Sequence, residues 1–136
     1  MPKAPKFTYG KFISAYHCLS SVDRKTCILL LNMGANPFIR DSNRWTALHH
    51  CAAGGCISTA EILLVNHSMR LMEATDQEGN TALHVAAKYG HEGIVELILS
   101  RGGDIRVRNK KRLTCLDVAI ECGKEKVAEV LINDDK

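Results

Sequence analysis

Short apolar blocks recur along the chain and alternate with polar stretches of similar length. The blocks are residues 27–31, 60–65, 94–99 and 127–132. A shorter apolar stretch precedes each of the last three blocks. Its residues are spaced three and four apart, as Leu83, Ala86 and Ala87 are, which is typical of a helix with one apolar face. The pattern therefore predicts pairs of short helices, with small alanines that let neighbouring helices approach closely.

A fixed period underlies these pairs. Thr46 and Thr81 are 35 residues apart, and Thr114 follows Thr81 by 33 residues. An aspartate or asparagine stands five residues before each of these threonines, and a glycine stands nine residues after it. The chain therefore contains repeated structural units, and the apolar block at residues 27–31 brings their number to four.

Each unit opens on residues that favour a turn and then a helix start. Aspartates such as Asp76 suit tight turns because their carboxylates bond nearby amides, and Gly79 supplies a positive φ. The threonine is a natural N-cap residue, because its hydroxyl can accept a hydrogen bond from an amide of the first helical turn. Glycine after the first helix, as at Gly90, takes the left-handed conformation of a C-cap. Each unit is predicted to be a turn followed by two helices.

A unit of this size cannot bury its own apolar faces. Stacked units bury them against each other, and each buried leucine contributes roughly 1.5–3 kcal/mol relative to an exposed one. The sequence therefore predicts a solenoid, in which each unit contacts only its neighbours.

These residues resemble the ankyrin repeat, whose pattern is roughly Asp-x-x-Gly-x-Thr-Pro-Leu-His-x-Ala-Ala-x-x-Gly-His. The stretch DQEGNTALHVAAKYGH (76–91) meets every fixed position but one, where Ala82 replaces proline. Two other stretches depart further from the pattern, DSNRWTALHHCAAGGC (41–56) and NKKRLTCLDVAIECGK (109–124). The resemblance implies an all-α ankyrin-repeat solenoid of paired antiparallel helices with short β-hairpin or turn loops.

We expect one ankyrin-repeat domain over residues 1–136. Its first repeat is degenerate, because it lacks the Thr-Pro-Leu-His stretch. Its last is expected to be a closing repeat, because Asp117 replaces the histidine and Ala128 is small. The four repeats are approximately residues 7–40, 41–75, 76–108 and 109–136.

One loop departs from the period. The second unit has two extra residues between its second helix and the next turn. We therefore expect a longer and irregular loop around residues 66–75, with Met69, Leu71 and Met72 exposed.

Composition and charge narrow the class of protein. Of the 136 residues 46% are apolar and 5% aromatic, and the net charge of +3 does not by itself require nucleic acid or membrane. The N-terminus lacks the apolar core of a signal peptide, and no apolar run approaches the roughly 20 residues of a membrane span. Without a signal peptide, the six cysteines are expected to be free thiols. We therefore expect a cytoplasmic or nuclear monomer without a transmembrane segment.

Two chemical interpretations compete with the repeat. His49, His50, Cys51 and Cys56 lie within eight residues, and zinc accepts such ligands. However, neither Cys-x-x-Cys nor His-x-x-x-His occurs, and His49 holds a helix-start position where its ring can bond the capping threonine. A cysteine nucleophile would need a polarising pocket and an orienting group, and no hydrolase, phosphate-loop or paired-carboxylate motif is present. We expect no metal, no cofactor and no catalytic residue.

A basic run, RVRNKKR, occupies residues 106–112 with five cations in seven positions. In the repeat frame it forms the hairpin between the third and fourth units, at the edge of the concave face. Three interpretations are open. The run is a solvated hairpin, it attracts an acidic protein surface, or it binds nucleic acid or anionic lipid. No aromatic residue interleaves the cations, so stacking on bases lacks its usual platform. Nucleic acid is therefore the least favoured of the three.

The resemblance also implies where recognition occurs, on the hairpin tips and the outer side of the first helices. Trp45 is the only tryptophan, and Trp and Tyr are preferred interface anchors. Its ring either stands exposed as such an anchor or packs on Arg44 or the adjoining hairpin. The implied residues are Ser42, Asn43, Trp45, Gln77, Glu78, Asn80, Lys88, Tyr89, Lys110, Lys111, Leu113, Glu121 and Cys122.

The sequence thus predicts a non-catalytic protein–protein interaction module that serves as an adaptor, scaffold or inhibitor. It would bind another protein, with an acidic surface, through its concave face and hairpin tips. Alternatively, the chain is the ankyrin segment of a larger signalling protein, ion channel or transcriptional regulator. A second alternative is a binder of nucleic acid or anionic membrane through residues 106–112. Phosphate binding would weaken steeply with salt, which separates this alternative from the others.

Overall fold

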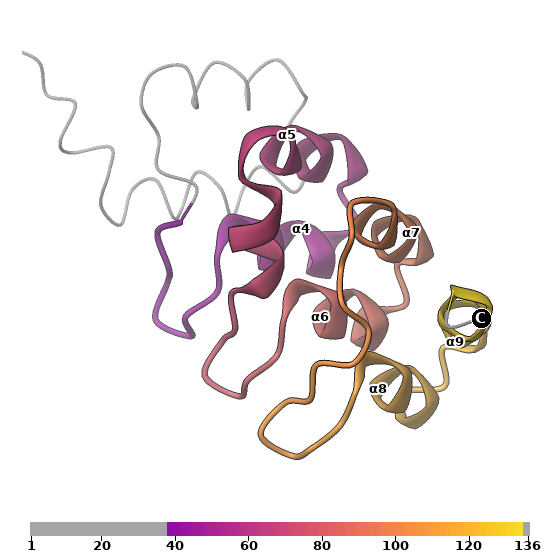
Figure 1. Cartoon of the computed structure of the whole chain (residues 1–136). Coiled ribbons are helices and arrows are strands. Elements are labelled where there is room, and N and C mark those ends of the chain that lie inside the picture. Colours follow the sequence, from indigo (N-terminus) through magenta and orange to yellow (C-terminus); the bar gives the residue numbers. More distant parts are fainter. Residues whose placement is uncertain (1–37, 135–136) are drawn as a thin grey trace, which may run out of the picture.

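The computed structural model describes residues 38–134, except for the side chains of residues 66–68. This part consists of three helix pairs stacked side by side, with α4, α6 and α8 in one row and α5, α7 and α9 in the other (Figure 1). Residues 38–134 contain no strand, so the predicted all-α solenoid is confirmed with turns between its pairs. The degenerate first repeat lies almost wholly outside the described residues. The helices are α4 (Ala47–Gly54), α5 (Ile57–Glu73), α6 (Ala82–Tyr89), α7 (Glu92–Ser100), α8 (Cys115–Glu121) and α9 (Glu125–Asp134).

Each helix of the inner row (α4, α6 and α8) begins after the threonine that the period predicts. The side chain of the threonine accepts a hydrogen bond from the amide three residues later, and the side chain of that later residue bonds the amide of the threonine. This reciprocal capping box satisfies two amides that a helix start would otherwise leave without a partner. Gly55 and Gly90 end α4 and α6 with φ of 73° and 76°. The boundaries of the inner helices are therefore set locally.

The core lies between the two rows of helices and between successive pairs. Leu48, Leu63 and Ile94 are fully buried. Ala52 and Ala87 are also fully buried, and their small side chains let α4, α6 and α8 approach one another closely. Since each pair covers the apolar side of the pair before it, burial in this fold depends on stacking.

Helix α5 is longer than the sequence led us to expect. It continues to Glu73, so the two extra residues of this unit extend the helix instead of forming an irregular loop at residues 66–75. Leu71 is fully buried and Met72 is 8% exposed, whereas Met69 is exposed as expected. Because Leu64 and Leu71 are seven residues apart, the longer helix keeps both on its buried face. The predicted exposure of Leu71 and Met72 was therefore wrong.

The turns between pairs share one geometry. The first residue of each turn accepts hydrogen bonds, through one side-chain oxygen, from the amides two and four residues later at 2.8–3.0 Å. Backbone hydrogen bonds link each turn to the next, from the Gln77 amide to the Asn43 carbonyl (3.2 Å) and from the Lys110 amide to the Glu78 carbonyl (2.9 Å). The turns therefore form a continuous edge along the stack. Their first residues are Asp41, Asp76 and Asn109.

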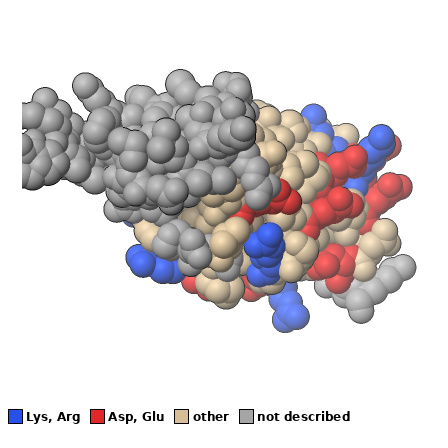
Figure 2. Space-filling model, turned by 90° about the horizontal axis from the view of Figure 1, so that it is seen from above, with Lys and Arg blue, Asp and Glu red and all other residues tan. Residues whose placement is uncertain are grey.

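Charge is distributed unevenly over the molecule. Seen from above, Asp and Glu side chains gather at the C-terminal end of the stack, where α7 and α9 lie (Figure 2). The five cations of residues 106–112 are all exposed and belong to the turn before α8 instead. The carboxylates and the basic turn therefore occupy different parts of the last two units. Exposed carboxylates of α7 and α9 are those of Glu96, Glu125, Glu129 and Asp134.

Candidate functional site

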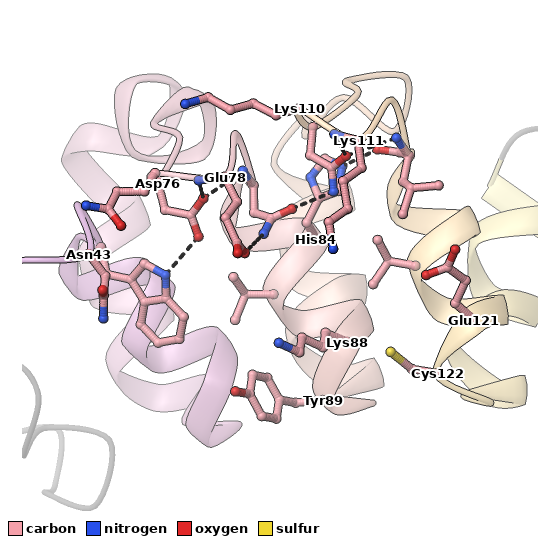
Figure 3. Close-up of a pocket in the computed structure, with 17 residues that line it drawn as sticks. Asn43, Asp76, Glu78, His84, Lys88, Tyr89, Lys110, Lys111, Glu121 and Cys122 are labelled. Atoms are coloured by element: carbon pink, nitrogen blue, oxygen red, sulfur yellow. Dashed lines mark hydrogen bonds between the residues drawn. The ribbon is translucent and has the colours of Figure 1, made fainter.

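A groove of about 470 Å³ runs along the stack between the turns and the inner helices (Figure 3). Lys88 and Tyr89 lie at the end of α6, Glu121 and Cys122 lie at the end of α8, and the turns form the opposite wall. The groove gathers every residue that the resemblance implied for recognition except Ser42. Those that line it are Asn43, Trp45, Gln77, Glu78, Asn80, Lys88, Tyr89, Lys110, Lys111, Leu113, Glu121 and Cys122.

The groove also has lining residues that the sequence did not single out. Val85 and Val118 contribute apolar surface although they are only 3% and 9% exposed. Each stands four residues after a capping threonine. The repeat therefore shows that the two valines hold equivalent positions, but a search for variable polar positions does not find them. Ser42 lies outside the groove lining, and its carbonyl accepts a hydrogen bond from the side-chain amide of Gln77 at 3.2 Å.

Trp45 packs on the adjoining turn. Its side chain is half-buried, and its Nε1 donates a hydrogen bond to Oδ2 of Asp76 at 2.9 Å (Figure 3). The indole also stacks on the His49 ring at a centroid distance of 6.0 Å. Asp76 is only 8% exposed, so this bond satisfies a carboxylate oxygen that has little access to water. Of the two alternatives for Trp45, the structure shows packing on the neighbouring turn, with the rest of the ring lining the groove.

Asn80 holds the equivalent position in the next unit and also links two turns. Its Oδ1 accepts a hydrogen bond from Nδ2 of Asn109 at 2.9 Å, and its own Nδ2 donates to Oε1 of Glu78 at 3.4 Å. Leu113, the third residue of this column, is apolar and forms no such link. The groove therefore has a hydrogen-bonded end near Trp45 and Asn80 and a more apolar end near Leu113.

Two buried histidines connect the units. Nδ1 of His49 accepts a hydrogen bond from the Thr46 amide at 3.2 Å, while its Nε2 lies 2.9 Å from the Asn80 carbonyl. His84 repeats this arrangement with Thr81 and with the Leu113 carbonyl. A carbonyl only accepts, so Nε2 carries the proton in both neutral rings. The prediction that these rings bond the capping threonine and the backbone is confirmed.

Comparison with known protein families identifies the family to which this architecture belongs. The family model described as ankyrin repeats (3 copies) matches residues 15–109 and again residues 72–136. The chain belongs to the ankyrin repeat family. The capping threonines, the linking histidines and the turn edge therefore belong to the framework of ankyrin repeats, and the groove is lined by residues that vary between the repeats together with framework residues such as Asp76 and His84.

Three relatives show the range of proteins in which similar ankyrin repeats occur. A transient receptor potential cation channel subfamily A member 1 homolog of Caenorhabditis elegans is 35% identical over 104 residues, 76% of this chain and 8% of that protein. NF-kappa-B inhibitor alpha of Homo sapiens is 35% identical over 83 residues, 58% of this chain and 26% of that protein. The human NAD-capped RNA hydrolase NUDT12 is 40% identical over 86 residues, 63% of this chain and 18% of that protein. The chain thus spans about a quarter or less of the length of these relatives.

The described cysteines lie in different surroundings. Burial raises the pKa of Cys115 to about 12, so this thiol stays protonated and is a poor nucleophile. Cys51 is buried, while Cys122 is exposed in the groove of the ankyrin stack. Within residues 38–134, no group of three or more His, Cys, Asp or Glu side chains is arranged to hold a metal ion. His50 instead pairs with Asp41, with 2.9 Å between Nε2 and Oδ2.

A membrane-crossing helix is also not found in this part of the chain. None of the helices described between residues 38 and 134 has both the length and the apolar content that a membrane span needs.

His49 and His84, the histidines that link successive units, make the free energy of unfolding of the ankyrin stack dependent on pH. Burial lowers the pKa of both His49 and His84 below the ordinary value of 6.5. Between the lowered pKa values and 6.5, the unfolded chain binds more protons than the folded one. The stability that the two neutral rings contribute is therefore complete above pH 6.5 and is lost as pH falls below it. The loss is at most about 1.4 kcal/mol per histidine for each pH unit below 6.5. Urea unfolding at pH 7.5 and 5.5 should therefore show a lower midpoint at pH 5.5.

The matched control for this prediction is a His84→Asp variant, which adopts the residue of the next repeat at this position. It should lose about half of the change that these two histidines cause, because only His49 of the pair then remains. An unchanged pH dependence in the variant would show that other groups are responsible.

Proposed function

We propose that the chain is a non-catalytic protein-interaction module that binds its partner in the groove between the turns and the inner helices. Family membership supports a protein partner. The observation that carries the location is the composition of the groove, where apolar side chains lie beside exposed lysines from two different units. Tyr89 is 45% exposed, and Leu113 lies half-buried at the other side of the groove. A partner could cover both without unfolding any helix.

The lysines of the groove suggest the charge of that partner. Lys88 lies beside Tyr89, with its Nζ 5.7 Å from the ring centroid. Lys110 and Lys111 belong to the opposite wall, where the Lys110 side chain runs along the top of the turns (Figure 3). Glu78 already receives a hydrogen bond from Asn80. We therefore propose an acidic rim on the partner that pairs with the three lysines, while its apolar centre covers Tyr89 and Leu113. The module would act as a monomer in this complex.

A test compares Tyr89→Ala/Leu113→Ala with the unchanged chain. Partners captured from lysate by the unchanged chain are identified, and their affinities are then measured by calorimetry with purified protein. The double variant should bind at least tenfold more weakly, since interface anchors contribute about 2 kcal/mol or more each. Its thermal midpoint should fall only moderately, because Tyr89 is exposed and Leu113, which packs against the core, is only partly buried.

The matched control is Val65→Ala, which truncates a side chain that is 65% exposed on α5 and lies outside the groove. It should leave binding unchanged. Trp45→Ala is a poorer probe, because losing its bond to the nearly buried Asp76 is expected to lower stability as well. Equal affinity of the double variant and the unchanged chain would place the binding site elsewhere.

The length of the relatives favours a second form of this proposal. Each of the three is at least about four times longer than the segment it shares with this chain. The same module could therefore serve as the ankyrin segment of a larger signalling protein, channel or regulator. The groove would then bind the partner, and the remaining activity would lie outside these repeats.

Nucleic acid or anionic membrane is the less favoured partner for residues 106–112. Two of the five cations, Lys110 and Lys111, line the groove with apolar residues, as expected for a protein partner with an acidic rim. Binding to phosphates through five cations would fall by orders of magnitude between low and physiological salt. Binding anchored by Tyr89 and Leu113 should weaken only modestly over that range.

A further inference from the structure

The last helix pair, α8 and α9, carries exposed apolar side chains. At the equivalent positions of the upstream pairs, the side chains are covered. Three residues of the last pair, Leu116, Ile120 and Ile132, define the terminal face. Ile120 is 62% exposed and Ile132 is 48% exposed. Each of the three has two equivalents, at the same position of the two upstream units. Leu116 corresponds to Leu48 and Leu83, Ile120 to Ala52 and Ala87, and Ile132 to Leu64 and Leu99. The first four of these upstream residues are at most 3% exposed and Leu64 is 1% exposed, whereas Leu99 is half-buried.

The upstream residues are buried because another helix pair lies against them. Helix α6 packs on α4, and α8 packs on α6 in the same way. Among the described elements, α8 and α9 form the last pair at this end of the stack (Figure 1). The terminal face thus corresponds by sequence position to surfaces that bury helices.

Two substitutions make the terminal face unsuited to a further repeat of the same kind. His84 reaches the next unit by donating from Nε2 to the Leu113 carbonyl, whereas the carboxylate of Asp117 cannot donate. Ile120 is also much larger than Ala87, which is fully buried where α6 meets its neighbour. A helix with the spacing of α8 against α6 would collide with Ile120. The occupant of this face must therefore pack at a wider helix separation.

Carboxylates border the apolar residues of the terminal face. Asp117 is three residues before Ile120 and Glu129 is three before Ile132, so each pair shares one side of its helix. Glu125 is seven residues before Ile132 and lies on the same stripe. Figure 2 shows Asp and Glu side chains, together with some Lys or Arg side chains, at the C-terminal end of the stack.

We propose that the terminal face docks an amphipathic helix of a partner protein, with an apolar stripe bordered by lysine or arginine. The apolar stripe would cover Ile120 and Ile132, whose burial provides the affinity. The basic border would pair with Asp117, Glu125 and Glu129. A second copy of this chain is disfavoured, because an isologous contact would bring the carboxylates of two copies together.

The test uses the full chain with methyl-labelled isoleucine and two synthetic peptides of 18 residues. Both peptides carry leucines at helical spacing; lysines border the stripe in one and glutamates in the other. The lysine peptide should shift the methyl resonances of Ile120 and Ile132. The glutamate peptide should bind at least tenfold more weakly, because its border repels the carboxylates. Absence of shifts at both isoleucines, or equal binding of the two peptides, would refute the proposal.

Variants separate this surface from the groove. Ile120→Ala installs the residue of the two upstream units, so the helix should fold normally and peptide binding should fall at least fivefold. Val65→Ala and Tyr89→Ala should leave peptide binding unchanged, and a loss with Tyr89→Ala would assign the peptide to the groove. Ultracentrifugation without peptide completes the test. Self-association that Ile120→Ala abolishes would show that a second copy covers the face, contrary to the proposal.

Discussion

His84→Ala should lower the free energy of unfolding by about 1.5–2.5 kcal/mol, part of it through the contact between two repeats. The variant loses the cap bond to the Thr81 amide, which is worth about 1 kcal/mol. It also loses the bond from Nε2 to the Leu113 carbonyl, which keeps its bond from the Asn109 amide, and a lost hydrogen bond costs about 0.5–1.5 kcal/mol. Urea unfolding followed by circular dichroism at pH 7.5 measures the sum.

The chain supplies a matched control at the same position of the next repeat. Asp117 makes the cap bond to the Thr114 amide at 3.1 Å, but it has no imidazole to reach a further unit. Asp117→Ala should therefore cost only about 1 kcal/mol. If the two alanine variants lose equal stability, the bond between His84 and the Leu113 carbonyl contributes nothing, and the histidine acts only as a cap.

Leu83→Ala should cost about 2–5 kcal/mol, the range measured for leucines truncated in closed cores. Leu83 is 3% exposed, and the next inner helix, α8, packs on α6. The cavity left by the substitution cannot be filled by water or by collapse without moving a neighbouring helix. Chemical unfolding at fixed pH gives the difference.

Leu116 is the matched control for Leu83, with the same side chain two residues after its capping threonine. It is only partly buried, since no described helix pair covers it. Leu116→Ala should therefore cost less than Leu83→Ala, because part of its apolar area is already exposed to water. A loss as large as that of Leu83→Ala would mean that the terminal face is covered in the isolated chain. That result would also contradict the proposed docking of a partner helix there.

The framework of this protein could be predicted from the sequence because its causes are local. A capping threonine, the residue three positions later and a C-cap glycine lie within a few residues of one another. Their spacing is therefore visible along the chain, and the structure places all three inner helices where it indicates. The linking role of His49 and His84 followed from the same frame.

The extent of α5 could not be predicted in this way. Two extra residues can lengthen a helix or a loop, and the sequence looks alike in both cases. Burial of Leu71 against the core decides for the helix, and that contact depends on elements far away in the chain. The role of Trp45 was open for the same reason, since its partner Asp76 is 31 residues away.

The candidate site was predictable as a set of positions but not as a surface. The repeat frame gathered the residues that line the groove, because equivalent positions of stacked repeats form a column. It did not show that Asn80 is engaged with Asn109, that Val85 and Val118 contribute to the lining, or that Leu113 remains without such a link. Each of these depends on the distance between neighbouring turns.

The sequence by itself determined the unit, its period and its caps, because these depend on interactions within about ten residues. Only the tertiary structure decided which apolar side chains are covered, because burial in a stack is supplied by the neighbouring unit. Leu83 and Leu116 are the same residue type at the same position of their repeats, yet the first is buried and the second lies on the terminal face. The difference lies in what stands next to them in space.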